Sequence, residues 1–277
     1  MMPPKSKIDI QIPNLKFVIG ILFVICHLSF VIAAPAVASY ISLNTSLTSR
    51  AQGDKLTVSV SVVNKGDESA YNVQAEVKLG NRQAMGEKKT ELPINGDYRA
   101  QFTFPLSYPR AGTYPLILVM HYTDANQYPF SALTCQTFAY KKEAAPEIFG
   151  QLKPTQFSGG GTVKLILKNM GESEIKAASR LILSRELTVK NGRSETALGS
   201  RSQKELDFDV SNFSALAGST YQAFAITEYE KGDYHFTVVS PGTISIVEKS
   251  LFKEYQIYFY AVIAVLLVLF IAFQFKK

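Results

Sequence analysis

Few side chains in this sequence could do chemistry, and they are scattered. Beyond residue 38 the chain has one cysteine, Cys135, and two histidines, His121 and His235. A cysteine nucleophile needs a nearby histidine and an electropositive setting, and nothing in the spacing brings these residues together. We expect Cys135 to be a buried free thiol on a core strand, and the histidines not to form a repeated ligand pair.

Acidic residues could offer oxygen ligands to a cation. Asp124 lies in one predicted hairpin tip, and Glu228, Glu230 and Asp233 lie around another. Such carboxylates can bind calcium weakly, but they are also ordinary solvated turn residues, and both interpretations stay open. The sequence has no H-E-x-x-H, G-x-S-x-G or paired-cysteine spacing. We therefore predict no catalytic residue, no cofactor and no metal site: the protein is not expected to be an enzyme.

The sequence pattern around these residues predicts β-strands. Thr57–Val62 and Tyr71–Val77 alternate apolar and polar residues, the pattern of a strand with one buried face. Turn residues follow or separate such segments, as at Asn64-Lys65-Gly66 and Asn95-Gly96-Asp97. No amphipathic helical period occurs between the apolar ends of the chain. The pattern predicts an all-β sandwich or barrel.

An internal repeat divides this β region in two. The pattern V-x-V-x-V-x-N-x-G at Val58–Gly66 recurs as V-x-L-x-L-x-N-x-G at Val163–Gly171, 105 residues later. Further on, Ala111–Tyr114 matches Ala217–Tyr221. A repeat of this length has the size of an immunoglobulin-like sandwich rather than of a solenoid unit. The sequence therefore predicts two tandem immunoglobulin-like β-sandwich domains.

The repeated tyrosines predict a structural feature of such domains. Tyr114 and Tyr221 each follow a glycine-containing turn, as in a tyrosine corner, where the hydroxyl bonds back to the preceding backbone. A role in stacking on a ligand is the alternative. Leu116 and Ala223 stand two residues further on, where an antibody domain has its second cysteine, so we expect sandwiches without disulfides.

The domain boundaries follow from the repeat. We expect the first sandwich at residues 39–142 and the second at 148–247. Residues 143–147, with charge, alanine and proline but no periodicity, read as a linker. The linker is short, so the two domains should touch.

Together these motifs resemble the CARDB-type and S-layer-type immunoglobulin-like domains of bacteria and archaea. The resemblance is carried by Val58–Gly66 and by G-T-Y-x-L-x-L-x-x-x-Y-T-D at Gly112–Asp124. It implies envelope-exposed modules used for adhesion, spacing, or attachment to partner proteins and glycans. It supplies no catalytic residues.

The N-terminus predicts an export signal at residues 1–38. Lysines precede the apolar run Phe17–Ala34, and Ala36-Val37-Ala38 offers a small-x-small cleavage pattern. Retention of this segment as a second anchor is the alternative, because the apolar run is long for a signal peptide.

The C-terminus predicts a transmembrane helix at residues 255–275. This stretch is uncharged, begins with clustered tyrosines and is followed by Lys276-Lys277. About 20 such residues rise roughly 30 Å, the thickness of a bilayer core, and tyrosines mark the interface. We expect a single-pass protein of the cell membrane with a cytoplasmic C-terminus and extracytoplasmic domains.

Charge argues against nucleic acid as a partner. The net charge is +6, but the excess lysines flank the apolar ends, whereas nucleic-acid binding needs a basic folded domain. We expect a non-catalytic envelope protein whose domains bind or position a partner protein. The alternative is a carbohydrate- or surface-binding adhesion module, which the absence of tryptophan disfavours. The sequons at Asn44 and Asn212 matter only where N-glycosylation occurs.

Overall fold

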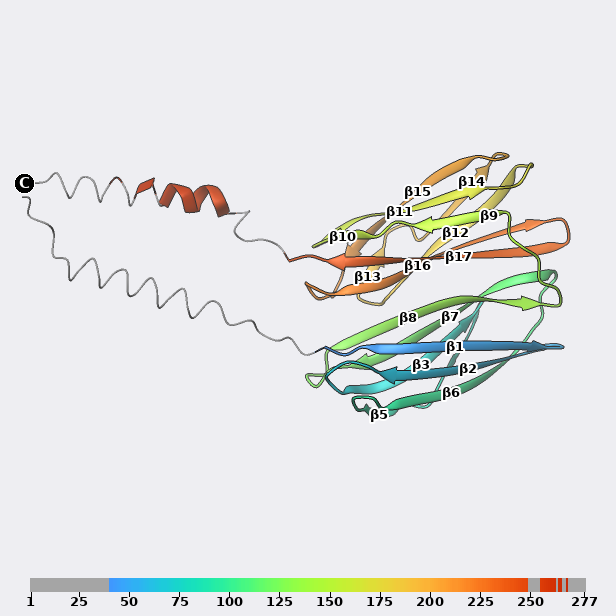
Figure 1. Cartoon of the computed structure of the whole chain (residues 1–277), viewed down its shortest axis with the longest axis horizontal. Coiled ribbons are helices and arrows are strands. Elements are labelled where there is room, and N and C mark those ends of the chain that lie inside the picture. The colour runs from blue at the N-terminus through green and yellow to red at the C-terminus, as the bar shows by residue number, and fades with distance from the viewer. Residues whose placement is uncertain (1–39, 249–254, 263, 266–267, 269–277) are drawn as a thin grey trace, which may run out of the picture. The chain divides into compact units, whose positions relative to one another are not determined.

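The computed structural model describes residues 40–248, 255–262, 264–265 and 268 (Figure 1). Between residues 40 and 248 all regular structure is β-sheet. The first eight strands are β1 (Leu43–Gln52), β2 (Lys55–Asn64), β3 (Ala70–Leu79), β4 (Arg82–Met85), β5 (Lys89–Leu92), β6 (Asp97–Pro105), β7 (Ala111–Thr123) and β8 (Pro129–Tyr140). The others are β9 (Ile148–Leu152), β10 (Thr155–Phe157), β11 (Gly160–Asn169), β12 (Ile175–Leu183), β13 (Leu187–Val189), β14 (Arg193–Leu198), β15 (Gln203–Asn212), β16 (Thr220–Lys231) and β17 (Tyr234–Ile246).

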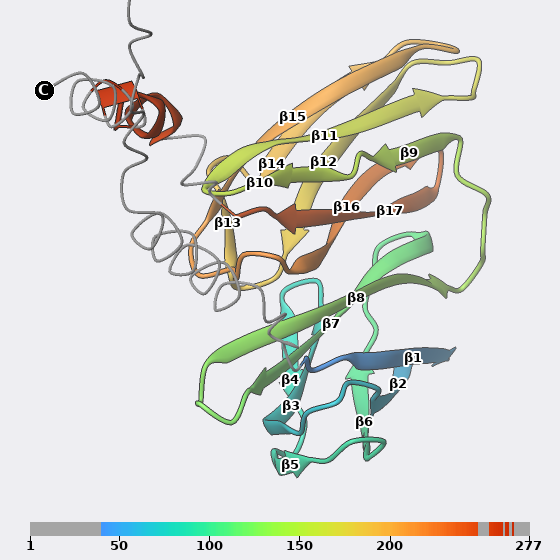
Figure 2. The ribbon, with the colours of Figure 1, turned by 60° about the vertical axis from the view of Figure 1, so that its left-hand side comes forward.

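The first eight strands form one sandwich. A sheet of order β1-β2-β6 faces β3, β4, β5, β7 and β8 (Figure 2). The alternating valines of β2 explain this layering, because Val58, Val60 and Val62 all point inward and are buried while the serines between them lie on the other face. Tyr98, Phe104 and other apolar side chains of both sheets complete the core.

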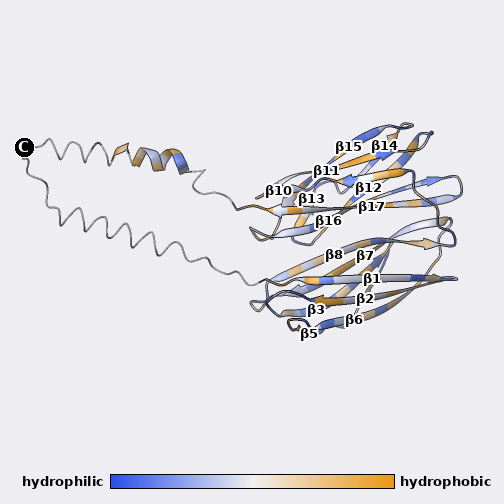
Figure 3. Ribbon diagram, viewed as in Figure 1, coloured by the Kyte–Doolittle hydropathy of each residue, from blue (hydrophilic) through white to orange (hydrophobic). Residues whose placement is uncertain are grey.

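The second sandwich repeats this plan with the later strands. The sheet β13-β15-β11-β9 faces β12, β14, β16 and β17, and β10 pairs in parallel with β17. Val163, Leu165 and Leu167 of β11 are fully buried, as the repeat predicts, and pack with Phe208 of β15. Apolar residues recur along strands of both sandwiches (Figure 3).

The repeated asparagines explain the N-x-G motif. Asn64 is fully buried; its Oδ1 accepts a hydrogen bond from Gly66 N (3.0 Å), and its Nδ2 donates to the carbonyls of Glu68 (2.7 Å) and Leu92 (3.2 Å). Asn169 Oδ1 accepts one from Gly171 N (2.9 Å) in the same way. Each asparagine therefore ties the turn after its strand to the neighbouring loop, satisfying backbone groups that the sheets leave free.

The all-β sandwich predicted from the sequence is confirmed. The predicted signal segment, residues 1–38, lies outside the described residues, as does part of the predicted helix at 255–275; residues 255–262, 264–265 and 268 of that stretch are helical. Among the described residues, no helix is both long and apolar enough to cross a membrane.

Candidate interaction surface

The two sandwiches are joined through their backbones. One sheet continues from the second sandwich into the first, because Tyr234 and His235 of β17 pair in parallel with Ala111 and Gly112 of β7. A Cβ on Gly112, whose φ is 139°, would lie 1.9 Å from the carbonyl oxygen of His235. Only glycine allows the two strands to approach this closely.

Two threonines extend this junction. Thr237 N donates a hydrogen bond to Thr113 Oγ1 (3.0 Å), and Thr237 Oγ1 donates one to the carbonyl of Thr113 (2.8 Å). Both side chains are buried, and such bonds are costly to leave unmade when water is excluded. The junction therefore contains buried side-chain hydrogen bonds of the kind found in the interior of a single domain.

An apolar cluster fills the space between the sandwiches. We call it the junction cluster; it comprises buried Ile117, Val119, Leu133, Phe224 and Ile226, with Cys135, Ile182 and Val239 partly buried against it. Ile117 and Val119 of β7 and Phe224 and Ile226 of β16 point away from the two sandwich cores, and residues of β8, β12 and β17 complete the cluster. Both β7 and β16 are therefore covered on both faces. The short linker does predict contact between the sandwiches, but this cluster was not predicted from the sequence.

Equivalent positions of the repeat meet in the junction cluster. Ile117 and Phe224 are 107 residues apart, as are Val119 and Ile226, and this is also the separation of Tyr114 and Tyr221. Leu133 lies opposite Val119 in the sheet register, and Val239 lies opposite Ile226. The same outer face of each sandwich therefore contributes to the contact.

Polar contacts close the junction at one side. Glu186, before β13, is fully buried and accepts hydrogen bonds from Ser131 N at Oε1 (2.6 Å) and from Ser131 Oγ at Oε2 (2.9 Å). Near it, the Tyr128 hydroxyl donates to the carbonyl of Ser214 (2.5 Å). A buried carboxylate needs such donors, so Glu186 ties β8 of the first sandwich to the second.

A charged group closes the junction at the β16–β17 turn. Arg110 lies before β7 and donates to the carbonyl of Gly232 (2.7 Å), and its guanidinium is 3.3 Å from a carboxylate oxygen of Glu230. Glu230 and Asp233 were expected together at a hairpin tip; Asp233 lies in the turn, whereas Glu230 is the second-last residue of β16. Glu230 is therefore engaged across the junction.

Glu228 corrects the hairpin-tip prediction. It lies within β16, with Oε1 3.4 Å from His235 Nε2 and Oε2 3.5 Å from Arg180. Burial by itself would raise the pKa of Glu228, but the interactions with His235 and Arg180 outweigh it and hold that pKa below the ordinary value. The His235 ring also stacks on Tyr114, with centroids 4.4 Å apart.

His121 has a similar partner in the first sandwich. Its Nε2 lies 2.8 Å from Glu76 Oε2 across β7 and β3. Burial would raise the pKa of Glu76, but His121 and Lys78 lower it below its ordinary value. Asp124 instead caps the β7–β8 turn, where its side chain accepts a hydrogen bond from Tyr128 N (2.8 Å). No group of three or more His, Cys, Asp or Glu placed to hold a metal occurs among the described residues.

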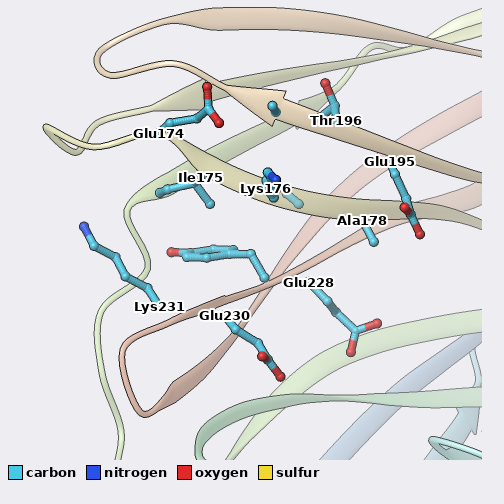
Figure 4. A pocket seen from close by; sticks show the side chains of 12 residues that line it. Glu174, Ile175, Lys176, Ala178, Glu195, Thr196, Glu228, Glu230 and Lys231 are labelled. Atoms are coloured by element: carbon cyan, nitrogen blue, oxygen red, sulfur yellow. The ribbon is translucent and has the colours of Figure 1, made fainter.

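An open groove of about 750 Å³ lies along β12, β14 and β16 of the second sandwich (Figure 4). Acidic side chains surround it, with two lysines: Glu174, Glu195, Glu228, Glu230, Lys176 and Lys231. The carboxylates are spread around the rim rather than aimed at one point. Lys231 binds both carboxylate oxygens of Glu147 at 2.7 Å. Several of these charges are thus neutralised within the protein, and the groove is better suited to contact with a polar surface than to holding a cation.

Cys135 lies on β8, and its thiol is free. The prediction of a core strand needs a correction, because the side chain packs against the junction cluster rather than inside the core of the first sandwich. Burial is the main cause that raises the pKa of this thiol to about 12. A thiol with that pKa stays protonated at neutral pH and is a poor nucleophile.

The two predicted corner tyrosines are buried at the starts of β7 and β16. The Tyr114 hydroxyl donates to the carbonyl of Arg110 (2.8 Å), and the Tyr221 hydroxyl accepts a hydrogen bond from Leu216 N (3.0 Å). Burial raises the pKa of both, that of Tyr114 to about 12. Each hydroxyl reaches back four or five residues along the chain. Whether that contact is their whole role stays a prediction.

The fold and this junction define a β-sandwich protein, and comparisons with known proteins go no further. No family model and no curated protein sequence matches the chain, so the resemblance to CARDB-type domains gains no support. Among solved structures, a transglutaminase from red sea bream aligns with 10% identity over 77% of this chain and 32% of its own, with a TM-score of 0.27.

Two other solved structures also align with low sequence identity and a low TM-score. A mutant α2-macroglobulin from Salmonella aligns with 13% identity over 74% of this chain and 16% of its own (TM-score 0.31). A protein of unknown function from Porphyromonas gingivalis aligns with 13% identity over 74% of this chain and 99% of its own (TM-score 0.27). Similarities this low carry no argument about function. The chain spans only a minor part of the transglutaminase and of the α2-macroglobulin.

Proposed function

We propose that this chain is a membrane-anchored, non-catalytic protein whose two sandwiches act as one extracytoplasmic body that binds or positions a partner protein. The observation that carries this proposal is the junction. Hydrogen bonds between Thr113 and Thr237, the junction cluster and the buried Glu186 hold the two sandwiches together. A body held this way presents surfaces of both sandwiches in a fixed relation, as a binding scaffold requires.

The membrane part of the proposal rests on the sequence. An apolar N-terminal segment with a small-x-small site favours export, and the uncharged stretch 255–275 followed by two lysines favours an anchor with a cytoplasmic end. The sandwiches would then lie outside the cytoplasm, next to the membrane that holds them.

The binding part is favoured by how the reactive side chains are used. His121 and His235 each face a glutamate, at 2.8 Å and 3.4 Å, and Cys135 has a strongly raised pKa. The contact with Glu76 gives His121 a structural role, and the raised pKa makes the Cys135 thiol a poor nucleophile. The exposed phenylalanines Phe149, on β9, and Phe213, after β15, lie near opposite ends of one sheet and do not form a single aromatic patch, which offers little support for the carbohydrate-binding alternative.

Photo-crosslinking in native membranes tests this proposal. A photoreactive amino acid is placed at Lys176 in the groove, or at exposed Met85 of the first sandwich, and adducts are identified by mass spectrometry. Position 226, buried in the junction cluster, is the matched control and should cross-link only within the chain. We expect the same partner protein to recur from at least one exposed position.

Two results would overturn separate parts of the proposal. Release of the full chain from membranes by alkaline carbonate would show that it is not an integral membrane protein. Alternatively, a substrate turnover abolished by His235→Ala or Glu228→Gln in a folded variant would show that the protein is an enzyme.

A further inference from the structure

We propose that the loop between β15 and β16 contacts the bilayer, dipping Phe213 and Leu216 into the lipid interface beside the anchor. This inference rests on the membrane anchor of the proposed function. The loop has the most conspicuous apolar exposure of the sandwiches: Phe213 is 77% exposed and Leu216 is 42% exposed. Apolar side chains displayed together in this way mark a contact surface rather than a core.

The loop is held in place from inside. Asn212 Oδ1 accepts a hydrogen bond from Ala215 N (2.7 Å), and the backbone nitrogens of Phe213 and Ser214 both donate to the carbonyl of Glu186 (3.0 Å). Leu216 N is bound by the Tyr221 hydroxyl. Specific hydrogen bonds therefore hold the two apolar side chains in an outward position, although exposing apolar surface to water is unfavourable.

The loop also lies where the chain leaves the second sandwich. Gly218 N donates to the carbonyl of Ile246 (2.7 Å), and Ile246 N donates to that of Ser219 (2.9 Å), so the loop brackets the end of β17. Val247, the next residue, is 41% exposed. The apolar stretch that begins at Tyr255 is eight residues further, which an extended chain spans in no more than roughly 30 Å.

The short connection between β17 and the predicted anchor indicates that the loop lies against lipid. If residues 255–275 cross the bilayer, the end of β17 and the loop bracketing it must stay within that reach of the membrane surface. Phenylalanine and leucine are apolar side chains that segments lying in the membrane interface bury among lipids. Lipid therefore fits the loop better than a protein surface does.

The absence of tryptophan from the chain allows a clean test in the full-length protein. Phe213→Trp and Leu216→Trp are reconstituted separately into phosphatidylcholine vesicles with and without brominated acyl chains. Phe149→Trp is the matched control, because Phe149 is 60% exposed but pairs with Lys168, at the other end of β11 from the Gly160–Ser211 pair beside the loop. That separation is roughly 25–30 Å along the strand. Tyr258→Trp reports on the anchor.

We expect the tryptophans at 213 and 216 to emit at shorter wavelength and to be quenched by bromine, and that at 149 to be unaffected. Quenching at 258 with none at 213 or 216 would overturn the loop contact and leave the anchor standing. No quenching at 258 would refute the anchor, and the loop contact with it. A blue shift at 213 without quenching, growing with protein density, would show that a second copy covers the loop instead. Circular dichroism confirms that each variant is folded.

Discussion

At the scale of single residues, the buried asparagines Asn64 and Asn169 are the most informative positions. Alanine at either leaves a glycine N–H and loop carbonyls without partners inside the protein. We expect each Asn→Ala change to lower the free energy of unfolding by about 2–3 kcal/mol, measured by urea denaturation in mild detergent. Asn44→Ala, at an exposed position of β1, is the control and should change it by less than about 0.5 kcal/mol. Equal effects at all three positions would contradict this account.

Asn212 shows how structure limits a sequence motif. It begins a sequon, but its side-chain nitrogen donates to the carbonyls of Ser158 (3.1 Å) and Ala215 (3.0 Å). A glycan on that nitrogen would replace one of its two hydrogens, break at least one of these bonds and disturb the loop that carries Phe213. Asn44, exposed on β1, has room for such a modification.

The corner tyrosines give a second prediction. Tyr114→Phe and Tyr221→Phe each remove one hydrogen bond while keeping the ring, so we expect a loss of about 1 kcal/mol in each. Tyr71→Phe serves as the comparison, since Tyr71 lies at no corner. The thermal midpoint is measured alongside capture of the cross-linked partner. An unchanged midpoint with lost capture would mean that the tyrosines act in binding.

At the scale of strands, the reactivity of Cys135 measures how well the junction cluster shields β8 from solvent. The raised pKa of its thiol, about 12 against an ordinary 9.0, means that the reactive thiolate is scarce even at pH 9. We expect alkylation of the native protein to stay slow from pH 7 to pH 9 and to become fast on unfolding. Thr48→Cys, on the exposed side of β1, should label quickly and faster as pH rises. Equally fast native labelling of Cys135 would show that the junction opens.

Strand patterns also show what could be predicted from the sequence. The alternation in Val58–Val62 predicts the buried face of β2 because one face of that strand meets water. In β7, by contrast, Leu116–Met120 is apolar throughout, as expected of a strand covered on both sides. That run could have pointed to a second buried face. It could not identify the cover, since Phe224 and Ile226 lie more than 100 residues further along the chain.

The same limit applies to the charged groups. Glu228 and Glu230 lie just before a turn-like sequence. Only the folded structure shows that Glu228 meets His235 and that Glu230 meets Arg110. Short sequence spacing predicts turns and caps well because the partners are neighbours. Contacts between sandwiches depend on how two folded sheets meet, and no local pattern encodes that.

At the scale of the whole molecule, Gly112 and Gly218 form a matched pair. They occupy corresponding positions of the repeat, but a Cβ on Gly218 would meet nothing within 4 Å. Gly218→Ala should cost about 1 kcal/mol, through its positive φ alone. Gly112→Ala should push β7 and β17 apart, cost more, and replace one unfolding transition by two in scanning calorimetry. A single transition in both variants would show that the sandwiches are not coupled through Gly112.

The make-up of the junction cluster has a consequence for the protein's history. Because Ile117 meets the same cluster as its counterpart Phe224, and Val119 the same as Ile226, corresponding positions of the two halves meet each other, as they do in a self-complementary interface. Duplication and fusion of a gene for a self-associating domain would give this arrangement within one chain. Once joined, the two halves no longer had to keep identical surfaces. The crowding around Gly112 and the open space around Gly218 show that the two halves differ at this position.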